Sequence, residues 1–400
     1  MKRYFYLIFF PIALIAQTAT APSSGDGSSG DPYQIDTLNN LYWITQNSGE
    51  WDAHYIQTAN IDASSSSSWD GGAGFTPIGN SSTRFTGSYN GDGHTISNLF
   101  INRSTSYIGL FGYIGVDANS TTTIQNLGLT NVSITGKNYV GALVGYKQEG
   151  TLTVSNCYIS GSVTGSGNFV GGLAGYLRNQ SNVVNSYSTG SVNGNNYVGG
   201  LAGYLRNQSN VVNSYSTGSV NGNNYVGGLA GYLNASPMSN SFWDTQTSGT
   251  STGIGAGTST GATGKTTAQM KSASTFTNAD WDFELETTNG TDDYWDMDND
   301  NSAYNSGYPF LSWENGDTVL FNLPPQATFS PANNAIDVAR DTDITITFTE
   351  AILNADASNI TDTNVDGLIT LKDTDASGTD IAFDATINAG KTVITINPTS

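Results

Sequence analysis

The feature that most constrains this chain is a perfect internal duplication. The segment GGLAGYLRNQSNVVNSYSTGSVNGNNYV, residues 171–198, is followed at once by an identical copy, residues 199–226. A unit of roughly 20 to 50 residues that recurs in tandem is typical of a stacked architecture, because so short a unit cannot enclose a core of its own. The duplication therefore predicts that each unit packs against the units before and after it.

Weaker copies of the unit flank the duplication. The Asn that begins NSYSTG has equivalents 27 to 30 residues apart, at Asn98, Asn126, Asn156, Asn185, Asn213 and Asn240. A Gly-Tyr pair recurs with a similar period and ends at Tyr113, Tyr146, Tyr176, Tyr204 and Tyr232. Two markers with one period predict an array longer than the two identical copies.

Apolar residues alternate around the Asn marker. Those two positions before it are Ile96, Ile124, Val154, Val183, Val211 and Met238, and those two positions after it include Phe100, Tyr158, Tyr187, Tyr215 and Phe242. A period of two is typical of strands, and the intervening Gly, Asn and Ser residues favour tight corners. We therefore predict an all-β fold, a parallel β-helix (β-solenoid), in which equivalent strands stack about 4.8 Å apart.

The repeated Asn has two interpretations. A buried column of Asn side chains can hydrogen-bond along the stack and form a structural ladder. Alternatively, each Asn occupies a surface corner, where its tolerance of left-handed backbone is sufficient reason for its presence.

The repeats resemble a known motif. VGALVGY at 140–146, VGGLAGY at 170–176 and the NSYSTGSV segments resemble the GLUG motif, and the resemblance extends to residues 85–101 before the array and 241–271 after it. That motif occurs in secreted bacterial surface proteins, including adhesin-like chains and some IgA-directed proteases. The resemblance implies a secreted or cell-surface bacterial protein, and it is more informative about architecture than about activity.

Composition divides the rest of the chain. Residues 1–21 resemble a cleaved secretory signal peptide, because their apolar run is shorter than the roughly 20 residues that span a membrane. Residues 22–32 are a predicted linker. Residues 33–97 are predicted to form an N-terminal cap, with a short helix and a strand, and the first rungs, before the array at 98–243. Residues 244–323 are predicted to form a Gly/Thr/Ser surface loop and an aromatic cap over the C-terminal end of the solenoid.

A Pro-Pro pair at 324–325 marks the last boundary. Residues 327–352 resemble the opening of bacterial Ig-like domains of surface proteins, and alternating residues predict strands at 344–349, 368–372, 381–387 and 392–397. Residues 324–400 are fewer than the roughly 100 of such a sandwich. We therefore expect a partial Ig-like β-sandwich and a natural polypeptide that continues past Ser400.

Charge restricts the possible partners. The net charge is −20, with 13 Lys and Arg residues, which makes nucleic acid and anionic membranes poor partners. Residues 121–243 nevertheless contain one acid, Glu149, and the four bases Lys137, Lys147, Arg178 and Arg206. The acidity therefore belongs mainly to the C-terminal part.

One segment suggests a metal site. Asp296, Asp298 and Asp300 lie at alternate positions, as do the oxygen ligands of a calcium loop. However, Asn301 stands where such a loop has Gly, and Gly307 stands where it has Glu. No other cofactor is expected, and the alternative to calcium is a solvated acidic turn.

Catalytic residues are not predicted. The lyases and hydrolases built on β-helices need paired carboxylates or acid–base clusters, and the repeats offer almost none. Asp92 and His94 in GDGHTI are interpreted as part of a structural turn, and His54 is the only other histidine. The single cysteine, Cys157, is interpreted as a small packed thiol.

The expected function is that of a non-catalytic, adhesin-like stalk. It would present a binding surface for glycans or partner proteins, for example the row Tyr176, Tyr204 and Tyr232, where weak contacts in register add through avidity. These tyrosines could instead be core residues, and the chain could be a plain spacer. The alternative function is a polysaccharide-binding or polysaccharide-degrading β-helix. No membrane span is expected once the signal peptide is removed.

Overall fold

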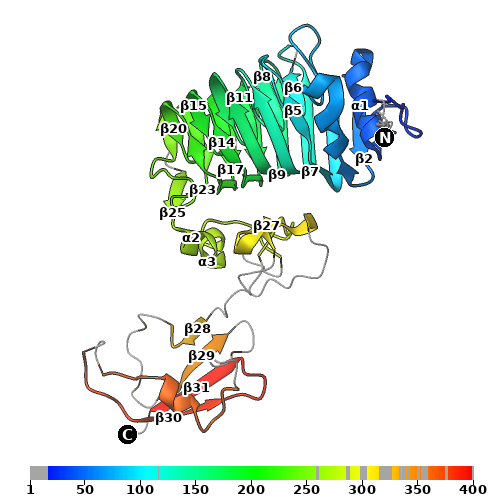
Figure 1. The fold of residues 1–400 in the computed structure, drawn as a ribbon. Coiled ribbons are helices and arrows are strands. Elements are labelled where there is room, and N and C mark those ends of the chain that lie inside the picture. The colour runs from blue at the N-terminus through cyan, green and yellow to red at the C-terminus, as the bar shows by residue number, and fades with distance from the viewer. Residues whose placement is uncertain are drawn as a thin grey trace, which may run out of the picture. The chain divides into compact units, whose positions relative to one another are not determined.

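The chain divides between Phe321 and Asn322 into two compact units (Figure 1). The computed structural model describes residues 17–115, 117–257, 261–284, 289–297 and 304–314 of the first unit and residues 327–332, 335, 339, 342–348, 352, 359–373 and 377–398 of the second. Within these ranges, none of the helices has the length and apolarity that crossing a membrane requires. Most of the predicted signal peptide, residues 1–16, lies outside the described residues.

A cap begins the first unit, as predicted. It contains β1 (Tyr33–Ile35), α1 (Leu38–Gln46), η1 (Ser48–Glu50), β2 (His54–Gln57), β3 (Ile61–Asp62) and η2 (Ser64–Gly72). Thr37 and Asn40 form a reciprocal capping box that starts α1, and Leu41 and Ile44 bury the inner side of the helix. Since β1 pairs with β2 and β2 with β4, this cap covers the first edge of the solenoid.

The predicted linker is wrong, because residues 22–32 fold against this cap. The N–H of Gln34 donates to the carbonyl of Ser24, and the N–H of His54 donates to the carbonyl of Gly27. Gly27 is buried with a φ of 81°, a conformation that glycine adopts without strain.

Parallel strands form three walls of the solenoid. One wall contains β6 (Phe111–Ile114), β8 (Val144–Lys147), β11 (Ala174–Arg178), β16 (Ala202–Arg206), β21 (Ala230–Asn234) and β24 (Ile254–Ala256), and a second contains β10 (Asn168–Gly171), β15 (Asn196–Gly199) and β20 (Asn224–Gly227). The largest wall adds to β1, β2 and β3 the strands β4 (Ser88–Ser97), β5 (Phe100–Asn102), β7 (Thr121–Gly136), β9 (Thr151–Gly165), β12 (Ser181–Val184), β13 (Tyr187–Ser188), β14 (Ser191–Asn193), β17 (Asn210–Val212), β18 (Tyr215–Ser216), β19 (Val220–Asn221), β22 (Met238–Ser239), β23 (Ser241–Asp244) and β25 (Ala262–Lys265).

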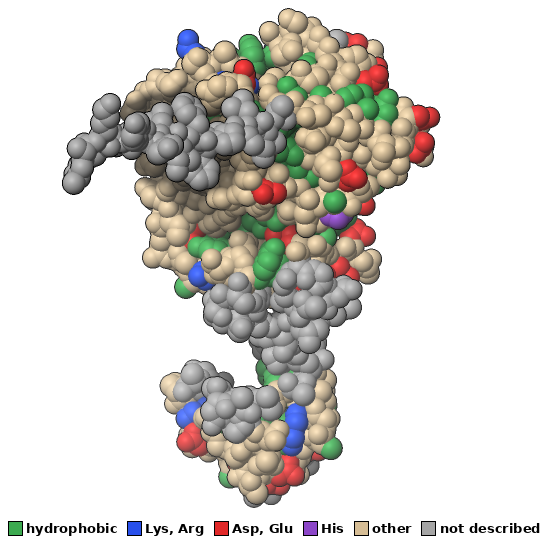
Figure 2. Space-filling view, turned by 45° about the vertical axis from the view of Figure 1, so that its right-hand side comes forward, with side chains coloured by type: hydrophobic (Ala, Val, Ile, Leu, Met, Phe, Trp, Pro, Cys, Tyr) green, Lys and Arg blue, Asp and Glu red, His purple; other side chains and the backbone are tan. Residues whose placement is uncertain are grey.

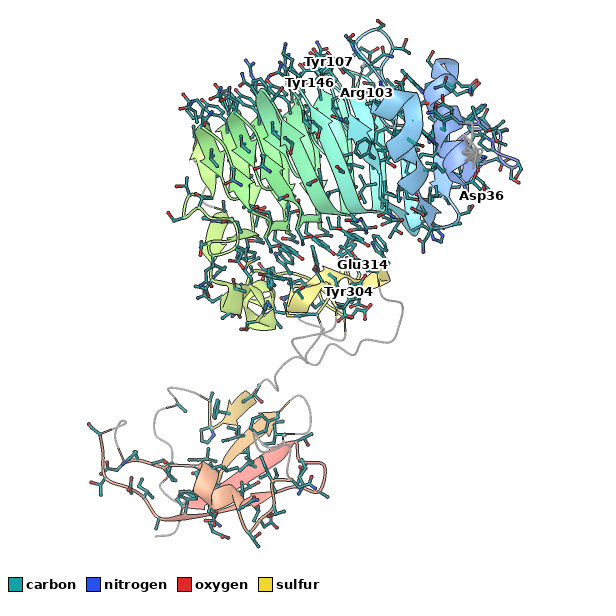
Figure 3. The ribbon with its side chains drawn as sticks, viewed as in Figure 1. Asp36, Arg103, Tyr107, Tyr146, Tyr304 and Glu314 are labelled. Carbon is teal, nitrogen blue, oxygen red and sulfur yellow. The ribbon has the colours of Figure 1, made fainter. Side chains whose placement is uncertain are left out.

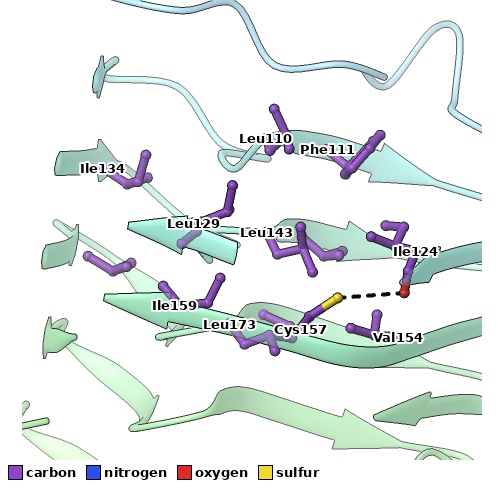
Figure 4. Close-up of a cluster of buried hydrophobic side chains, with 14 of the residues drawn as sticks. Leu110, Phe111, Ile124, Leu129, Ile134, Leu143, Val154, Cys157, Ile159 and Leu173 are labelled. Carbon is purple, nitrogen blue, oxygen red and sulfur yellow. Dashed lines mark hydrogen bonds between the residues drawn. The ribbon is translucent and has the colours of Figure 1, made fainter. Parts of the chain in front are cut away.

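Identical residues lie over one another in the duplicated rungs. Ala174 pairs with Ala202, and Tyr176 pairs with Tyr204. Inside, fully buried columns such as Leu173, Leu201 and Leu229 fill the core. Cys157 is also buried, among Ile124, Val154, Ile159 and Leu173 (Figure 4). The predicted parallel β-helix and the packed thiol are both confirmed.

The second glycine of the GLUG core has a steric reason. A Cβ placed on Gly203 would lie 2.6 Å from the carbonyl oxygen of Gly175 and 2.6 Å from the nitrogen of Val170. Gly175 and Gly231 have equally close neighbours. Only glycine allows the strands of this wall and of the β10–β15–β20 wall to approach so closely, which is why Gly-Tyr recurs once per rung.

The predicted stacking of Asn98, the first Asn marker, over Asn126 is wrong, because β4 contains a bulge between Asn90 and His94. Ile96 pairs with Leu129, so Asn98 lies next to Asn131 and not in the column of Asn126. From Asn126 onward the predicted columns are confirmed by the pairs Ile124–Val154, Val154–Val183, Val183–Val211 and Val211–Met238.

The predicted surface loop and the predicted cap over the C-terminal end of the solenoid, both within 244–323, are wrong in their placement. Within 244–264, β24 and part of β25 belong to the last rung of the solenoid. The described residues 266–284, 289–297 and 304–314, here called the lateral segment, contain α2 (Thr267–Met270), α3 (Ala273–Thr277), β26 (Trp295–Asp296), η3 (Asn305–Gly307), β27 (Phe310–Leu311) and η4 (Ser312–Glu314). This segment runs along the side of the solenoid, back to Gly93 in β4, instead of covering the end (Figure 1). Its predicted aromatic core is present, with Trp281, Phe283 and Trp295 fully buried.

The second unit contains an antiparallel sheet. Its order is β28 (Ala327–Ser330), β29 (Ile344–Phe348), β31 (Val393–Pro398) and β30 (Phe383–Ile387). Three of these strands match predicted ones. The strand predicted at 368–372 is wrong, because η5 (Val365–Leu368) occupies its start and Lys372 makes an isolated bridge to Asp380.

Candidate functional site

The predicted Tyr176, Tyr204 and Tyr232 lie in one stacked column on the outside of the β8–β11–β16–β21 wall. The ring centroids of Tyr176 and Tyr204 are 4.7 Å apart with planes 2° from parallel, and those of Tyr204 and Tyr232 are 4.9 Å apart. Tyr146 and Tyr113 continue this inner column toward the N-terminus. Burial raises the pKa of Tyr113 to about 12 and also raises that of Tyr204, so these phenols remain protonated donors at neutral pH.

A second column, which the sequence reasoning missed, packs edge-on against the first. This outer column contains Tyr107, Tyr139, Phe169, Tyr197 and Tyr225, with successive centroids 4.8 to 5.1 Å apart. Its rings meet the inner column at 84°, 77° and 87° in three successive rungs. The two columns together are here called the aromatic ladder, and Figure 3 shows Tyr107 and Tyr146 on this side of the solenoid. The signal was available, since each ring comes directly before a Val-Gly pair of its repeat, or before Ile-Gly in the case of Tyr107.

The outer column is built on unusual backbone. All five of its residues have positive φ, between 55° and 68°. Such a conformation costs a non-glycine residue on the order of 1–3 kcal/mol and persists only where the surroundings enforce it. Ring stacking, worth about 0.5–1.5 kcal/mol for a pair beyond its buried area, offsets part of that cost.

Two arginines accompany the ladder. Arg178 and Arg206 are register partners at the ends of β11 and β16, on the same side as Tyr176 and Tyr204. Arg178 lies 4.0 Å from the carboxylate of Glu149. Arg206 is exposed, and no carboxylate among the described residues lies within ion-pair distance of it.

A buried lysine closes the corner beside these arginines. Lys147 takes the place of a core leucine, since its register partner is Leu177. Its Nζ donates to the carbonyl oxygens of Gly150, Arg178 and Asn179, and burial lowers its pKa to about 8. With its donors satisfied inside the wall, Lys147 does not contribute to the surface.

The Asn marker fits both interpretations in part. Asn156 donates to Asn126 and Asn126 to Asn90, each at 3.1 Å, which is a short ladder. Asn185, Asn213 and Asn240 share the left-handed backbone of the corner, with φ from 46° to 48°. A more regular ladder of Asn168, Asn196 and Asn224 lies on the β10–β15–β20 wall, with bonds of 2.8 and 2.7 Å.

A third aromatic column on the opposite side of the solenoid is covered. Tyr158, Tyr187, Tyr215 and Phe242 pack against the tryptophans and Phe276 of the lateral segment. The hydroxyl of Tyr187 donates to the Glu314 carboxylate at 2.8 Å, and that of Tyr304 donates to it at 3.4 Å (Figure 3). Burial raises the pKa of Glu314 to about 8. This contact fastens the lateral segment to the wall.

The predicted calcium loop is described only at its start. Asp296 is buried and accepts the N–H of Met297 at 2.6 Å, while Asp298 and Asp300 lie outside the described residues. Within the described ranges, no group of three His, Cys, Asp or Glu residues is placed to hold a metal ion.

The histidines lie near the cap. Asp92 occupies a left-handed turn position in the β4 bulge, and His94 pairs with Leu127. His54 Nδ1 lies 2.6 Å from the hydroxyl of Ser88, a contact that the sequence reasoning missed. These two residues are register partners on β2 and β4, so strand pairing alone brings them together.

Family comparisons agree with this architecture. A model of the GLUG motif matches residues 194–221, and a model of a bacterial Ig-like domain matches residues 322–400. The chain therefore contains a GLUG motif followed by a bacterial Ig-like domain, which confirms both resemblances.

Two relatives match about a third of the chain. Halomucin of Haloquadratum walsbyi is 47% identical over 130 residues, which are 32% of this chain and 1% of halomucin. A protein of Evansella cellulosilytica assigned as a Gly-rich membrane protein is 37% identical over 153 residues, which are 36% of this chain and 17% of that protein. This chain thus spans a small part of the length of either relative.

One solved structure has a similar fold. It is that of a protein from Bacteroides ovatus assigned as an immunoglobulin A1 protease, with a TM-score of 0.53 and 18% identity. The match covers 73% of this chain and 95% of that one. At this identity the similarity shows the β-helical fold alone.

Proposed function

We propose that this chain is a secreted or cell-surface repeat protein without catalytic activity, whose solenoid binds extracellular glycans or partner proteins. The observation that carries the proposal is the aromatic ladder, which repeats one arrangement of side chains over five rungs. Weak contacts repeated in register add through avidity, and strained backbone is often retained at binding sites. The Ig-like domain and the relative assigned as a membrane protein support a location at the cell surface.

A glycan array probed with the full chain tests this proposal. We expect selective retention by wild type and weaker retention by Tyr225→Ala, because Tyr225 is the most exposed ring of the ladder at 45%. The matched control is Phe329→Ala, which removes an aromatic ring that is 53% exposed in the second unit. Retention that is unchanged in Tyr225→Ala, or absent in wild type, would remove the ladder as a glycan site.

The same array with and without calcium tests the metal hypothesis. Calcium-dependent retention would assign a role to the loop that begins at Asp296. Equal retention with calcium and with a chelator would leave the solvated acidic turn as the better interpretation.

The enzymatic alternative has one pair of residues to test. A serine nucleophile needs a base that a third group orients, and no carboxylate in the described part of the chain accepts a hydrogen bond from His54. We expect the full chain to release no acetate from acetylated polysaccharides, in wild type and Ser88→Ala alike, since a serine nucleophile would attack an ester. Activity that Ser88→Ala abolishes would make the chain a hydrolase.

A further inference from the structure

The aromatic ladder presents ring edges and not ring faces. Inner and outer rings are both stacked at about one-rung spacing, so the rings inside each stack are covered on both faces. Tyr225, the last ring of the outer column, is stacked on one face by Tyr197 and is 45% exposed. Tyr176 is only 8% exposed. A sugar therefore finds no open aromatic face inside the stacks, and recognition there depends on hydroxyl groups and neighbouring polar side chains.

Cations stand beside these hydroxyls at the same spacing. The Arg206 guanidinium lies next to the Tyr176 hydroxyl, and that of Arg178 lies next to the Tyr146 hydroxyl one rung earlier. Two successive rungs therefore each present one arginine beside one phenol, and the next rung has Asn234 at the arginine position. These two arginines are here called the arginine row.

The surrounding stretch has the opposite charge balance to the rest of the chain. The protein has a net charge of −20, and Figure 2 shows acidic side chains spread over the face in view. Residues 121–243 contain Glu149 as their one acid. The arginine row is thus a basic strip on an acidic protein, which favours an anionic ligand of low charge density.

The neighbouring wall adds amides along the same direction. Asn196 and Asn224 each donate to the Asn one rung earlier, so their side chains form a continuous polar row. Amides in such a row can donate to and accept from hydroxyl groups. Arginine, phenol and amide rows together suit a ligand that carries both hydroxyls and regularly spaced carboxylates.

We propose that the aromatic ladder and its arginine row bind a linear acidic polysaccharide that lies along the solenoid axis. This inference rests on the proposed function. A guanidinium pairs with a carboxylate through two parallel hydrogen bonds. A pyranose unit is about as long as one rung, ~4.8 Å, so successive sugars meet successive rungs. Duplex DNA, with one charge per ~1.7 Å, is far denser in charge than the row and is repelled by the acidic remainder.

Binding of the full chain to polygalacturonate, compared with its fully methyl-esterified form, tests the proposal. The two polymers share a backbone and differ in their carboxylate charge. We expect wild type to bind polygalacturonate at least tenfold more tightly than the ester, and Arg178→Gln/Arg206→Gln to lose that preference. The matched control is Lys271→Gln, which removes a cation from the lateral segment, where it lies over the Tyr308 ring. Circular dichroism verifies that each variant is folded.

The outcomes separate this inference from the proposed function. Equal binding of the two polymers, or an unchanged preference in the double arginine variant, overturns the acidic ligand while glycan binding stands. Tighter binding of a duplex DNA than of polygalacturonate also overturns it, in favour of a general polyanion site. If neither polymer binds and the glycan array is empty, the proposed glycan function fails with it.

Discussion

The solenoid carries two kinds of tyrosine stack that differ in what lies outside them. Tyr187 and Tyr215 stack at 4.8 Å, as closely as Tyr204 and Tyr232 do. The first pair is sealed under the lateral segment, whereas the aromatic ladder has no segment over it among the described residues. One repeat thus produces two similar rows, and the residues that follow the array determine which row remains available.

The largest loss of stability is expected from adding a side chain at Gly203, where the close backbone packing beneath the aromatic ladder requires glycine. Gly203→Ala places a Cβ 2.6 Å from backbone atoms of Gly175 and Val170 in the neighbouring rung, so the outer column can no longer lie over the inner one. We expect a loss of about 3 kcal/mol in the free energy of unfolding, measured by chemical denaturation. Gly49→Ala is the control, because a Cβ there meets nothing within 4 Å. Equal stability of the two variants would contradict the steric account of the motif.

Chemical modification sharpens the comparison of the two stacks. Mild acetylation followed by mass spectrometry should modify Tyr225, which is 45% exposed, at least tenfold faster than Tyr187 and Tyr215, which are 2% and 0% exposed. Similar rates for the three residues would show that the lateral segment does not seal its stack in solution.

The stability of the contact between the lateral segment and the tyrosine stack beneath it should depend on pH. The pKa of Glu314 rises from its ordinary 4.5 to about 8 on folding, so its contribution to stability is full below about pH 4.5 and is lost as the pH rises to 8. We expect the melting temperature to fall by a few degrees between pH 5 and pH 9, and Glu314→Gln to flatten that dependence. Glu149→Gln, which removes a carboxylate near the ladder, should keep the wild-type profile. If Glu314→Gln kept the wild-type dependence of melting temperature on pH, other groups would be responsible for that dependence.

The smallest effect is expected in the core. The column of Cys157 continues as Ser186, Ser214 and Ser241, and the hydroxyls of Ser186 and Ser214 donate to the carbonyl two residues earlier at 2.8 Å. The Cys157 thiol already lies 3.2 Å from the equivalent carbonyl of Ser155. Cys157→Ser should therefore change stability by less than about 1 kcal/mol in thermal melts. A larger loss would show that the thiol packs in a way a hydroxyl cannot.

The array could be predicted because its information is local and repeated. Alternation around Val183 and its equivalents identifies the inner face, and the period identifies which residues stack. The prediction from periodicity is wrong at Asn98, because a bulge shifts the strand register without changing the apparent spacing of the Asn markers. Tyr197 and Tyr225 were also missed, because they lie in β15 and β20 and reach the rings of the next wall only through left-handed backbone.

Contacts between distant segments could not be predicted. No periodicity connects Glu314 to Tyr187, which lies 127 residues earlier in the chain. An aromatic cluster after a repeat array is compatible with a cap over its end or a cover along its side, and only the three-dimensional path decides between these. The basic strip was visible in the composition, but its alignment into one row depends on the register of Arg178 with Arg206.

The lateral segment fits an array of one particular length. Removal of residues 199–226 would join Val198 to Gly227 and recreate a junction that the chain already has, so the solenoid itself has no preferred number of copies. The lateral segment does, because it contacts Phe242 through Phe276 at one end and lies against Gly93 through Trp313 at the other. One copy more or fewer would displace these two anchor points by about one rung, ~4.8 Å. A change in the number of repeats would therefore break or strain one of these two contacts, so the lateral segment favours the present number of repeats.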